Sequence, residues 1–119
     1  MTIRLLLPIV IPGQNTRERW HWTKQRREVK QWAAWARSMT TPAQAAKGKR
    51  RVRIVSYRRQ RFHDRANLVG GCKGLIDGLV EAGLLVDDRI GLMEATYEQD
   101  VVVNSPDRKP VTLIEIEDL

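Results

Sequence analysis

The 119-residue chain has a single cysteine, Cys72. One cysteine excludes an intrachain disulfide and a zinc site built from several thiolates, and it favours a reducing cytoplasm. Long apolar runs are also lacking. The run from Leu5 to Ile11 is short, is interrupted by Pro8 and has no small-residue cleavage site, so it predicts a strand and neither a signal peptide nor a membrane span. No internal repeat divides the chain, and its length predicts one domain covering residues 1–119.

Acidic residues are scarce in the first half of the chain. Residues 1–60 hold 15 Lys and Arg against two acids, a balance of +13, and residues 61–119 hold six against 12, a balance of −6. Together these give the net charge of +7. A basic half attracts polyanions such as nucleic acid, and an acidic half can hold cations. The alternative is charge that serves solubility alone.

Hydrophobic periodicity predicts two helices and four strands. We expect strands over residues 3–10, 49–57, 92–103 and 111–117, and helices over 17–39 and 68–82, capped by Thr16 and Asn67. In the strand 49–57, Arg51, Arg53 and Val55 alternate with Val52, Ile54 and Ser56, which predicts one basic and one apolar face. The order β-α-β-α-β-β predicts a small mixed α/β domain with two helices packed on a mixed sheet.

The apolar positions of the helices recur at helical spacing. The first stripe consists of Trp22, Val29, Trp32, Ala33, Ala36 and Met39, and the second of Leu68, Cys72, Leu75, Ile76, Leu79 and Ala82. Gly83 predicts the end of the second helix. Gly70, Gly74 and Gly78 share one face of that helix, which indicates close approach by the sheet or by a partner helix, the alternative being loose packing.

Carboxylates flank the second helix. Asp64 precedes it, and Asp87 and Asp88 follow it. If the helix folds back on the preceding strand, these carboxylates can converge. Converging carboxylates on a basic chain favour a metal-dependent enzyme that acts on nucleic acid, because Mg²⁺ held by carboxylates can activate water for phosphodiester hydrolysis.

In this segment the chain resembles the RusA-type Holliday-junction resolvases, a family typically encoded by phages and prophages. Their signature is Asp-x-Asp-Asn, a Lys and an Asp on the next helix, then a Gly and an Asp-Asp pair. The chain matches it at Asp64, Asn67, Lys73, Asp77, Gly83, Asp87 and Asp88. The N-terminal strand, Pro12, Asn15 and the Trp-rich helix resemble the family more loosely.

The resemblance implies a structure-specific endonuclease that resolves four-way DNA junctions as a homodimer, in the cytoplasm of a bacterial or phage-infected cell. It implies Mg²⁺ as cofactor, with Mn²⁺ as a substitute, and neither a nucleotide cofactor nor a membrane partner. Asp64, Asp87 and Asp88 are the implied metal ligands, and Asp64, Asp88 and Lys73 the implied catalytic residues. Lys73 is expected near the scissile phosphate, although an ordinary surface pair with Asp77 is the alternative.

The chain departs from the family signature at one position, because Ala66 stands where the second Asp of Asp-x-Asp-Asn is expected. On an extended strand, position 66 would share a face with Asp64, and alanine cannot bind a metal. The loss is either natural or engineered. We expect it to impair cleavage, which leaves a catalytically weak or inactive junction-binding protein of the same fold as the alternative. Glu94 or Glu98 is a candidate substitute ligand.

Basic residues supply the expected DNA contacts. We assign phosphate binding to Arg51, Arg53, Arg58, Arg59, Arg61 and Lys73. Trp32 is expected in the core, whereas Trp20 and Trp35 lie off the apolar stripe, where they could meet a partner chain or DNA. His21 is expected at the surface. A third, weaker hypothesis is a phage assembly or regulatory protein that binds a protein through its basic face.

Overall fold

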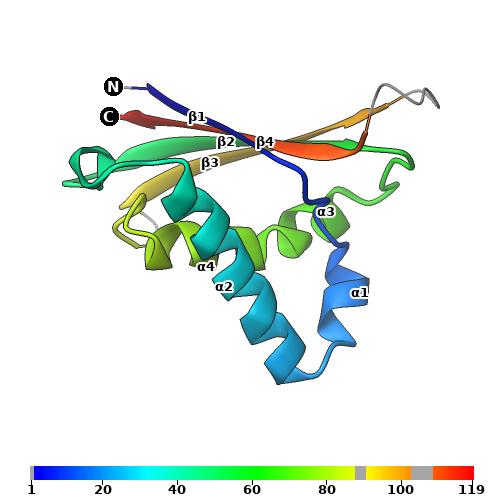
Figure 1. Ribbon diagram of the computed structural model, residues 1–119. Coiled ribbons are helices and arrows are strands. Elements are labelled where there is room, and N and C mark those ends of the chain that lie inside the picture. The colour runs from blue at the N-terminus through cyan, green and yellow to red at the C-terminus, as the bar shows by residue number, and fades with distance from the viewer. Residues whose placement is uncertain (1, 88–90, 103–108) are drawn as a thin grey trace.

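The computed structural model describes residues 2–87, 91–102 and 109–119, and Figure 1 shows their arrangement. Within these ranges the elements are β1 (Thr2–Leu7), α1 (Gln14–Glu18), α2 (Trp22–Ser38), the 3₁₀ turn η1 (Pro42–Gln44), β2 (Arg50–Arg58), α3 (Arg65–Gly71), α4 (Lys73–Glu81), β3 (Met93–Val101) and β4 (Val111–Asp118). The expected mixed α/β class is confirmed.

The described strands form one mixed sheet with the order β1-β4-β2-β3. β2 and β3 are parallel, and the other neighbouring strands are antiparallel. Parallel neighbours need a long crossover, which here is the α3–α4 segment. The helices cover one face of the sheet and leave the other face open (Figure 1).

The alternation expected for the strand around β2 is confirmed. Val52 and Ile54 are fully buried beneath the helices, whereas Arg51 lies on the open face. Register extends this division across the sheet, since Val52 pairs with Ile116 and Ile54 with Ile114. These residues join one apolar core with residues from β1, α2, α3 and α4. Burial of that core is the main favourable term in folding.

Each expected long helix is in fact two helices. The first is interrupted after Glu18, and His21, not Thr16, caps α2 by accepting a hydrogen bond from the Thr23 N–H at 3.3 Å. The second is interrupted at Cys72, whose N–H donates to the Val69 carbonyl with the tighter 3₁₀ spacing.

The expected burial of two side chains at the ends of the first helix is wrong. Trp22 is 70% exposed and Met39 is 43% exposed, because the stripe that meets the core is confined to Val29, Trp32, Ala33 and Ala36. The α3–α4 stripe is confirmed, with Ala82 packed at its edge.

The glycine face of the α3–α4 segment meets other helices. A Cβ at Gly74 would lie 1.9 Å from Oε1 of Glu28, and a Cβ at Gly78 would lie 2.6 Å from the Cβ of Trp32, both on α2. A Cβ at Gly70 would meet Gln14 on α1 at 2.4 Å. Close helix approach, and not loose packing, therefore explains these glycines.

Gly83 ends α4 as expected. Its φ is +82°, and the N–H groups of Gly83 and Leu84 donate to the carbonyls of Val80 and Leu79. This is a Schellman arrangement, which satisfies carbonyls at the end of a helix. The turn then places Leu84 and Leu85 in the core just before Asp87.

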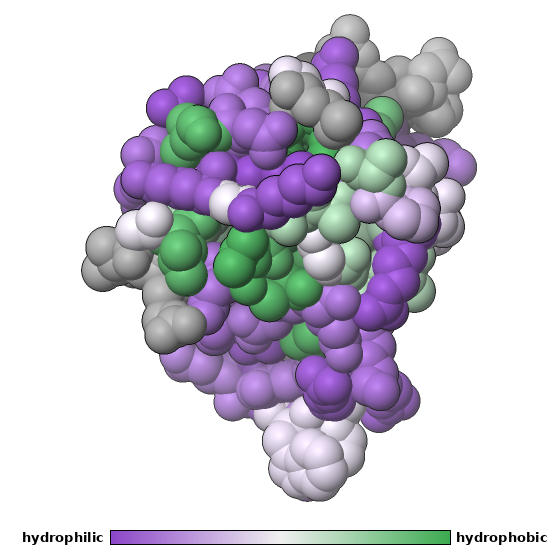
Figure 2. Space-filling view, turned by 90° about the vertical axis from the view of Figure 1, so that its left-hand side faces the viewer, coloured by the Kyte–Doolittle hydropathy of each residue, from purple (hydrophilic) through white to green (hydrophobic). Residues whose placement is uncertain are grey.

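Polar side chains dominate the end of the molecule seen in Figure 2, and apolar side chains form small patches between them. No helix in the described part of the chain has the length and apolar character needed to cross a bilayer.

The glycine packing yields a stability prediction. Alanine usually stabilises a helix interior by about 1 kcal/mol relative to glycine, but a Cβ at position 78 would also lie 2.9 Å from the Val29 carbonyl oxygen. We therefore expect Gly78→Ala to lower the free energy of unfolding by about 1–3 kcal/mol in urea titrations. Gly48→Ala is the control, because nothing lies within 4 Å of a Cβ there. Equal stability of the two variants would contradict the close helix packing.

Candidate functional site

Asp64 and Ala66 lie at the beginning of α3, where sequence analysis placed an extended strand. Asp64 is the N-cap, and its Oδ1 accepts a hydrogen bond from the Ala66 N–H at 2.9 Å. The expectation that both side chains share one strand face is therefore wrong, because β2 already ends at Arg58. Aspartate and asparagine cap helices about equally well, and here the N–H of Asn15 occupies the side chain of Asn67, which leaves Asp64 as the cap. Both Asp64 and Ala66 are exposed.

Asn67 has a different role from the cap that we expected. It lies inside α3, and its Oδ1 accepts a hydrogen bond from the Asn15 N–H at 3.0 Å. This contact joins α3 to α1 across 52 positions of sequence. Asn67 thus holds the start of α3 in place beside Asp64.

The segment before Asp64 is fixed to β3 by one side chain. The Phe62 N–H donates to Oε1 of Gln99 at 2.9 Å, and Nε2 of Gln99 donates to the Phe62 carbonyl at 3.0 Å. The amide of Gln99 therefore satisfies both backbone groups of Phe62, as a neighbouring strand would. Arg65 adds a bond from Nη1 to the Tyr97 carbonyl at 3.2 Å.

Arg58 is an internal connector of the loop. Its guanidinium donates to the carbonyls of Ile11 and Gln60 and to the hydroxyl of Ser56, and it lies 3.6 Å from the centroid of the Phe62 ring. Partial burial lowers its pKa. Three donated hydrogen bonds leave this side chain less able to bind phosphate than an exposed arginine is.

Basic side chains accompany the single carboxylate of this loop along the chain. Arg59, Arg61, His63 and Arg65 are all exposed, as Asp64 is. A pocket of about 430 Å³ lies here between the loop and β3. Its lining is Arg61, Phe62, His63, Arg65, Leu68, Tyr97, Glu98 and Gln99. The three arginines of this group can attract a polyanion to the surface that carries Asp64.

Lys73 and Asp77 form the surface ion pair that was the alternative interpretation of Lys73, on successive turns of α4. Lys73 Nζ lies 3.0 Å from Asp77 Oδ1, and 55% of the Lys73 side chain is exposed. The ion pair keeps Lys73 at the surface, where it can exchange one anionic partner for another.

The described carboxylates do not by themselves complete a metal site. Mg²⁺ prefers six oxygen ligands. Within residues 2–87, 91–102 and 109–119, no group of three or more His, Cys, Asp or Glu side chains is arranged to hold a metal ion. Asp64 and Asp87 lie inside those ranges. Asp88, and with it the expected convergence of Asp88 and Asp64, lies outside the described residues.

Arg51 and Arg53, two of the four arginines of β2, lie in ion pairs across the open face of the sheet. Arg51 contacts Glu117 at 3.0 Å and Glu94 at 3.3 Å, whereas Arg53 contacts Glu98 at 2.9 Å and also Glu115. Each arginine therefore lies between two carboxylates from neighbouring strands. The face that sequence analysis treated as basic is close to neutral here.

The same contacts change the acidity of the sheet carboxylates. Hydrogen bonds from Lys49 and Arg51 lower the pKa of Glu94, and the guanidinium of Arg53 lowers the pKa of Glu98. Both glutamates, the candidate substitutes for a ligand at position 66, are thus held by cations. Glu98 still borders the pocket beside Asp64.

Cys72 belongs to the core. It is fully buried, and burial raises the pKa of its thiol to about 12. A thiol in this state is a poor nucleophile, which confirms its interpretation as a small buried hydrophobe.

Sequence patterns did not predict the buried Arg50 or the largely buried side chain of Glu28. Arg50 is 4% exposed and donates to Asp118 Oδ1 and to the carbonyls of Leu84 and Ala45. Glu28 accepts from Arg17 Nε at 2.6 Å. The charge run around Arg50 gave no sign of burial. Glu28 is the single acid in the basic helix α2, and this isolation was the available sign that its side chain is bound inside the protein.

No protein-family model matches the chain, and no curated protein matches it.

Proposed function

We propose that the chain is a structure-specific endonuclease of the RusA resolvase type, which resolves four-way DNA junctions as a homodimer. Its metal-dependent phosphodiester cleavage is impaired, because Ala66 supplies no carboxylate. Two-fold symmetry suits a four-way junction, since resolution requires paired cuts in opposing strands.

One observation carries the proposal. Asp64 is an exposed carboxylate at the start of α3, in a loop that also exposes Arg59, Arg61, His63 and Arg65. Arginines beside an exposed carboxylate can hold the phosphates that flank a scissile bond, and phosphate contacts position a protein on DNA without reading its sequence. The spacing of Asp64 from the residues of the following helix is the part that resembles the resolvases.

Lys73 has a place in this proposal. Its ammonium group is exposed and bound to Asp77, and a phosphate oxygen could replace that partner. A cation there would stabilise the negative charge that develops on a phosphoryl oxygen. Mg²⁺, if bound, would supply the activated water and the polarised phosphate. Of positions 64 and 66, only position 64 carries a carboxylate. We therefore assign no step to a metal.

The second candidate function is a junction-binding protein without catalysis. It is favoured by Ala66 and by the ion pairs that occupy Glu94 and Glu98. A protein-binding role in phage assembly or regulation is the third, and failure of the protein to bind DNA would favour it.

Arginines in the loop and in the sheet should differ in their contribution to DNA binding. Arg59→Gln/Arg61→Gln should flatten the plot of log affinity against log salt by about 0.9 for each lost contact, or about 2 in all, because fewer counterions are released. The double variant Arg51→Gln/Arg53→Gln loses the same charge. Because Arg51 and Arg53 are already bound to glutamates, the salt dependence of this variant should change less. The measurement is junction binding by fluorescence anisotropy at several salt concentrations. An equal change in both slopes would place DNA on the sheet as well.

Ala66→Asp should raise metal-dependent cleavage. Loss of a group that only supports a metal ligand lowers metal affinity or activity by roughly 10–100-fold. Restoring a direct ligand should therefore raise the cleavage rate by at least the same factor. The substitution should fold, because Ala66 is exposed in the first turn of α3, where negative charge is worth about 0.3–1 kcal/mol. The assay is cleavage of a synthetic four-way junction with Mg²⁺ or Mn²⁺.

Ala34→Asp is the matched control for this assay, since it adds the same charge at an exposed position of α2. Robust cleavage by the unmodified chain would contradict the role given to Ala66 and would indicate a substitute ligand such as Glu98. Junction binding without cleavage by Ala66→Asp would favour the non-catalytic candidate.

A further inference from the structure

The two edges of the sheet differ in what covers them. In the strand order β1-β4-β2-β3, the edge strands are β1 and β3. The loop before α3 lies against β3, since Arg65 donates to the Tyr97 carbonyl and Gln99 bonds to both backbone groups of Phe62. Within the described part of the chain, the backbone of β1 bonds to β4 alone. The outer backbone groups of β1 can therefore pair with a further strand.

The side chains of β1 give this edge little protection. Natural proteins usually protect an edge strand with several charges, a proline or a bulge. β1 has one charged residue, Arg4, and Leu6 on the open face of the sheet is 56% exposed. β3 differs, because Glu94, Glu98 and Asp100 are exposed along it and would repel the same residues of a second copy. Of the two edges, β1 is the one suited to pair with itself.

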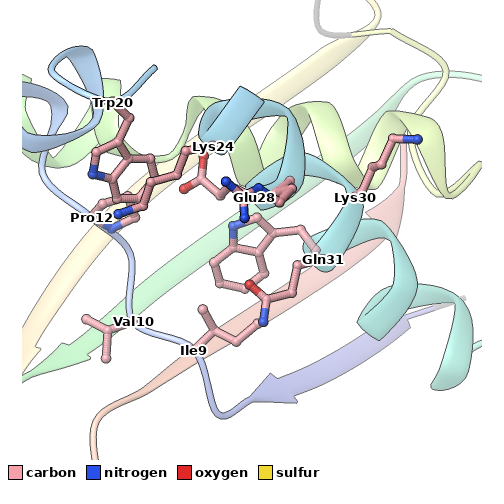
Figure 3. A pocket seen from close by; sticks show the side chains of 10 residues that line it. Ile9, Val10, Pro12, Trp20, Lys24, Glu28, Lys30 and Gln31 are labelled. Carbon is pink, nitrogen blue, oxygen red and sulfur yellow. The ribbon is translucent and has the colours of Figure 1, made fainter. Parts of the chain in front are cut away.

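Exposed apolar surface continues from the end of β1 onto α2. A groove of about 890 Å³ lies between α2 and the segment that follows β1, and Ile9, Val10 and Gln31 are among its lining residues. Figure 3 shows Ile9 and Gln31 together at one end of it. Trp35 and Met39 follow Gln31 at intervals of four residues and so share its face of α2. Both are exposed, at 36% and 43%, which is typical of an interaction surface when such residues border an open strand edge.

Symmetry favours a second copy of the chain as the partner of this edge. Antiparallel pairing of β1 with β1 of another copy is closed by a two-fold axis, whereas pairing of β1 with β3 of another copy continues without closing. The two-fold axis is perpendicular to the sheet, so the helices of both copies lie on the same side of the joined sheet. Asp64 lies at the start of α3, within that helical layer (Figure 1). Both Asp64 loops would then face one DNA junction.

Charge selects one register for such a pair. The two registers that pair most of β1 are centred on Arg4 and on Leu5. The first sets two arginines directly opposite one another, which is unfavourable. The second sets Arg4 opposite the partner's Leu6 and Ile3 opposite the partner's Leu7. Ile3, Leu5 and Leu7 are buried on the helical side of β1, so the second register also joins the two apolar cores.

We infer that β1 pairs antiparallel with β1 of a second copy in the register centred on Leu5, and that the two sheets form one continuous sheet. The inference rests on the proposed function, which requires a homodimer, and it assigns the interface of that homodimer. The exposed stripe of α2 lies beside the same edge and adds apolar contacts beneath the joined strands.

Leu6→Lys and Leu6→Glu form a matched pair for this interface. Both replace the same exposed side chain, and each new side chain would lie opposite the partner's Arg4. Lysine there meets a like charge and glutamate an opposite charge, and the two-fold axis repeats each contact. We expect the dimer dissociation constant of Leu6→Lys to exceed that of Leu6→Glu by roughly 10-fold or more in sedimentation velocity over a concentration series. Equal constants for the two variants would overturn the inference.

Two further variants control for position and for folding. Arg4→Glu/Leu6→Lys exchanges the charges of the opposed pair and should recover the dimer that Leu6→Lys weakens. Thr96→Lys adds the same charge at an exposed position of the other edge strand and should change the dissociation constant by about twofold or less. A thermal melt of each variant identifies loss of folding. A larger effect of Thr96→Lys than of Leu6→Lys in folded variants would place the interface on β3 and overturn the inference.

Junction binding by the same variants separates this inference from the proposed function. A dimer that Leu6→Lys leaves as tight as in the unmodified protein, with junction binding intact, would remove the β1 interface and leave the proposed function standing. A dimer that responds to the charge pair as expected but binds no DNA would keep the β1 interface and remove the proposed function. An unmodified protein that is monomeric and binds no junction would remove both.

Discussion

The close contact between α2 and α4 is the constraint on which the other features depend. It exists because Gly74 and Gly78 lack a Cβ where Glu28 and Trp32 approach. This approach buries Trp32 in the core and encloses the carboxylate of Glu28. It also fixes α4, and so the position of Lys73 relative to the beginning of α3. A helix pair held farther apart would expose Trp32 and Glu28.

Several features of the fold follow directly from sequence patterns. Alternation of apolar and basic residues predicted which side chains of β2 face the helices, since side chains of a strand point to opposite faces in turn. Helical spacing predicted the buried residues of α4, and Gly83 predicted its end, where the φ of +82° favours glycine. The glycine spacing indicated a close approach but did not identify α2 as the partner.

Other features depend on contacts between distant segments and could not be predicted. Asp64 and Asn67 are both good caps, and the bond from Asn15 to Asn67 favours the earlier start of α3. Arg51 and Arg53 suggested a DNA surface, because the sequence does not reveal that strand register places Glu117 and Glu115 beside them. Periodicity placed Trp22 in the core, but the break before α2 leaves it at an exposed helix end.

The central claim is that the chain recognises branched DNA, and direct comparison of a four-way junction with a linear duplex of the same arm sequence tests it. Binding is measured by fluorescence anisotropy in EDTA, which prevents cleavage, and at one fixed salt concentration, because phosphate contacts make affinity depend on salt. The account predicts at least about 10-fold tighter binding of the junction, or about 1.4 kcal/mol. Equal affinity for the junction and the duplex would contradict it, because attraction of a basic protein to any polyanion would then suffice.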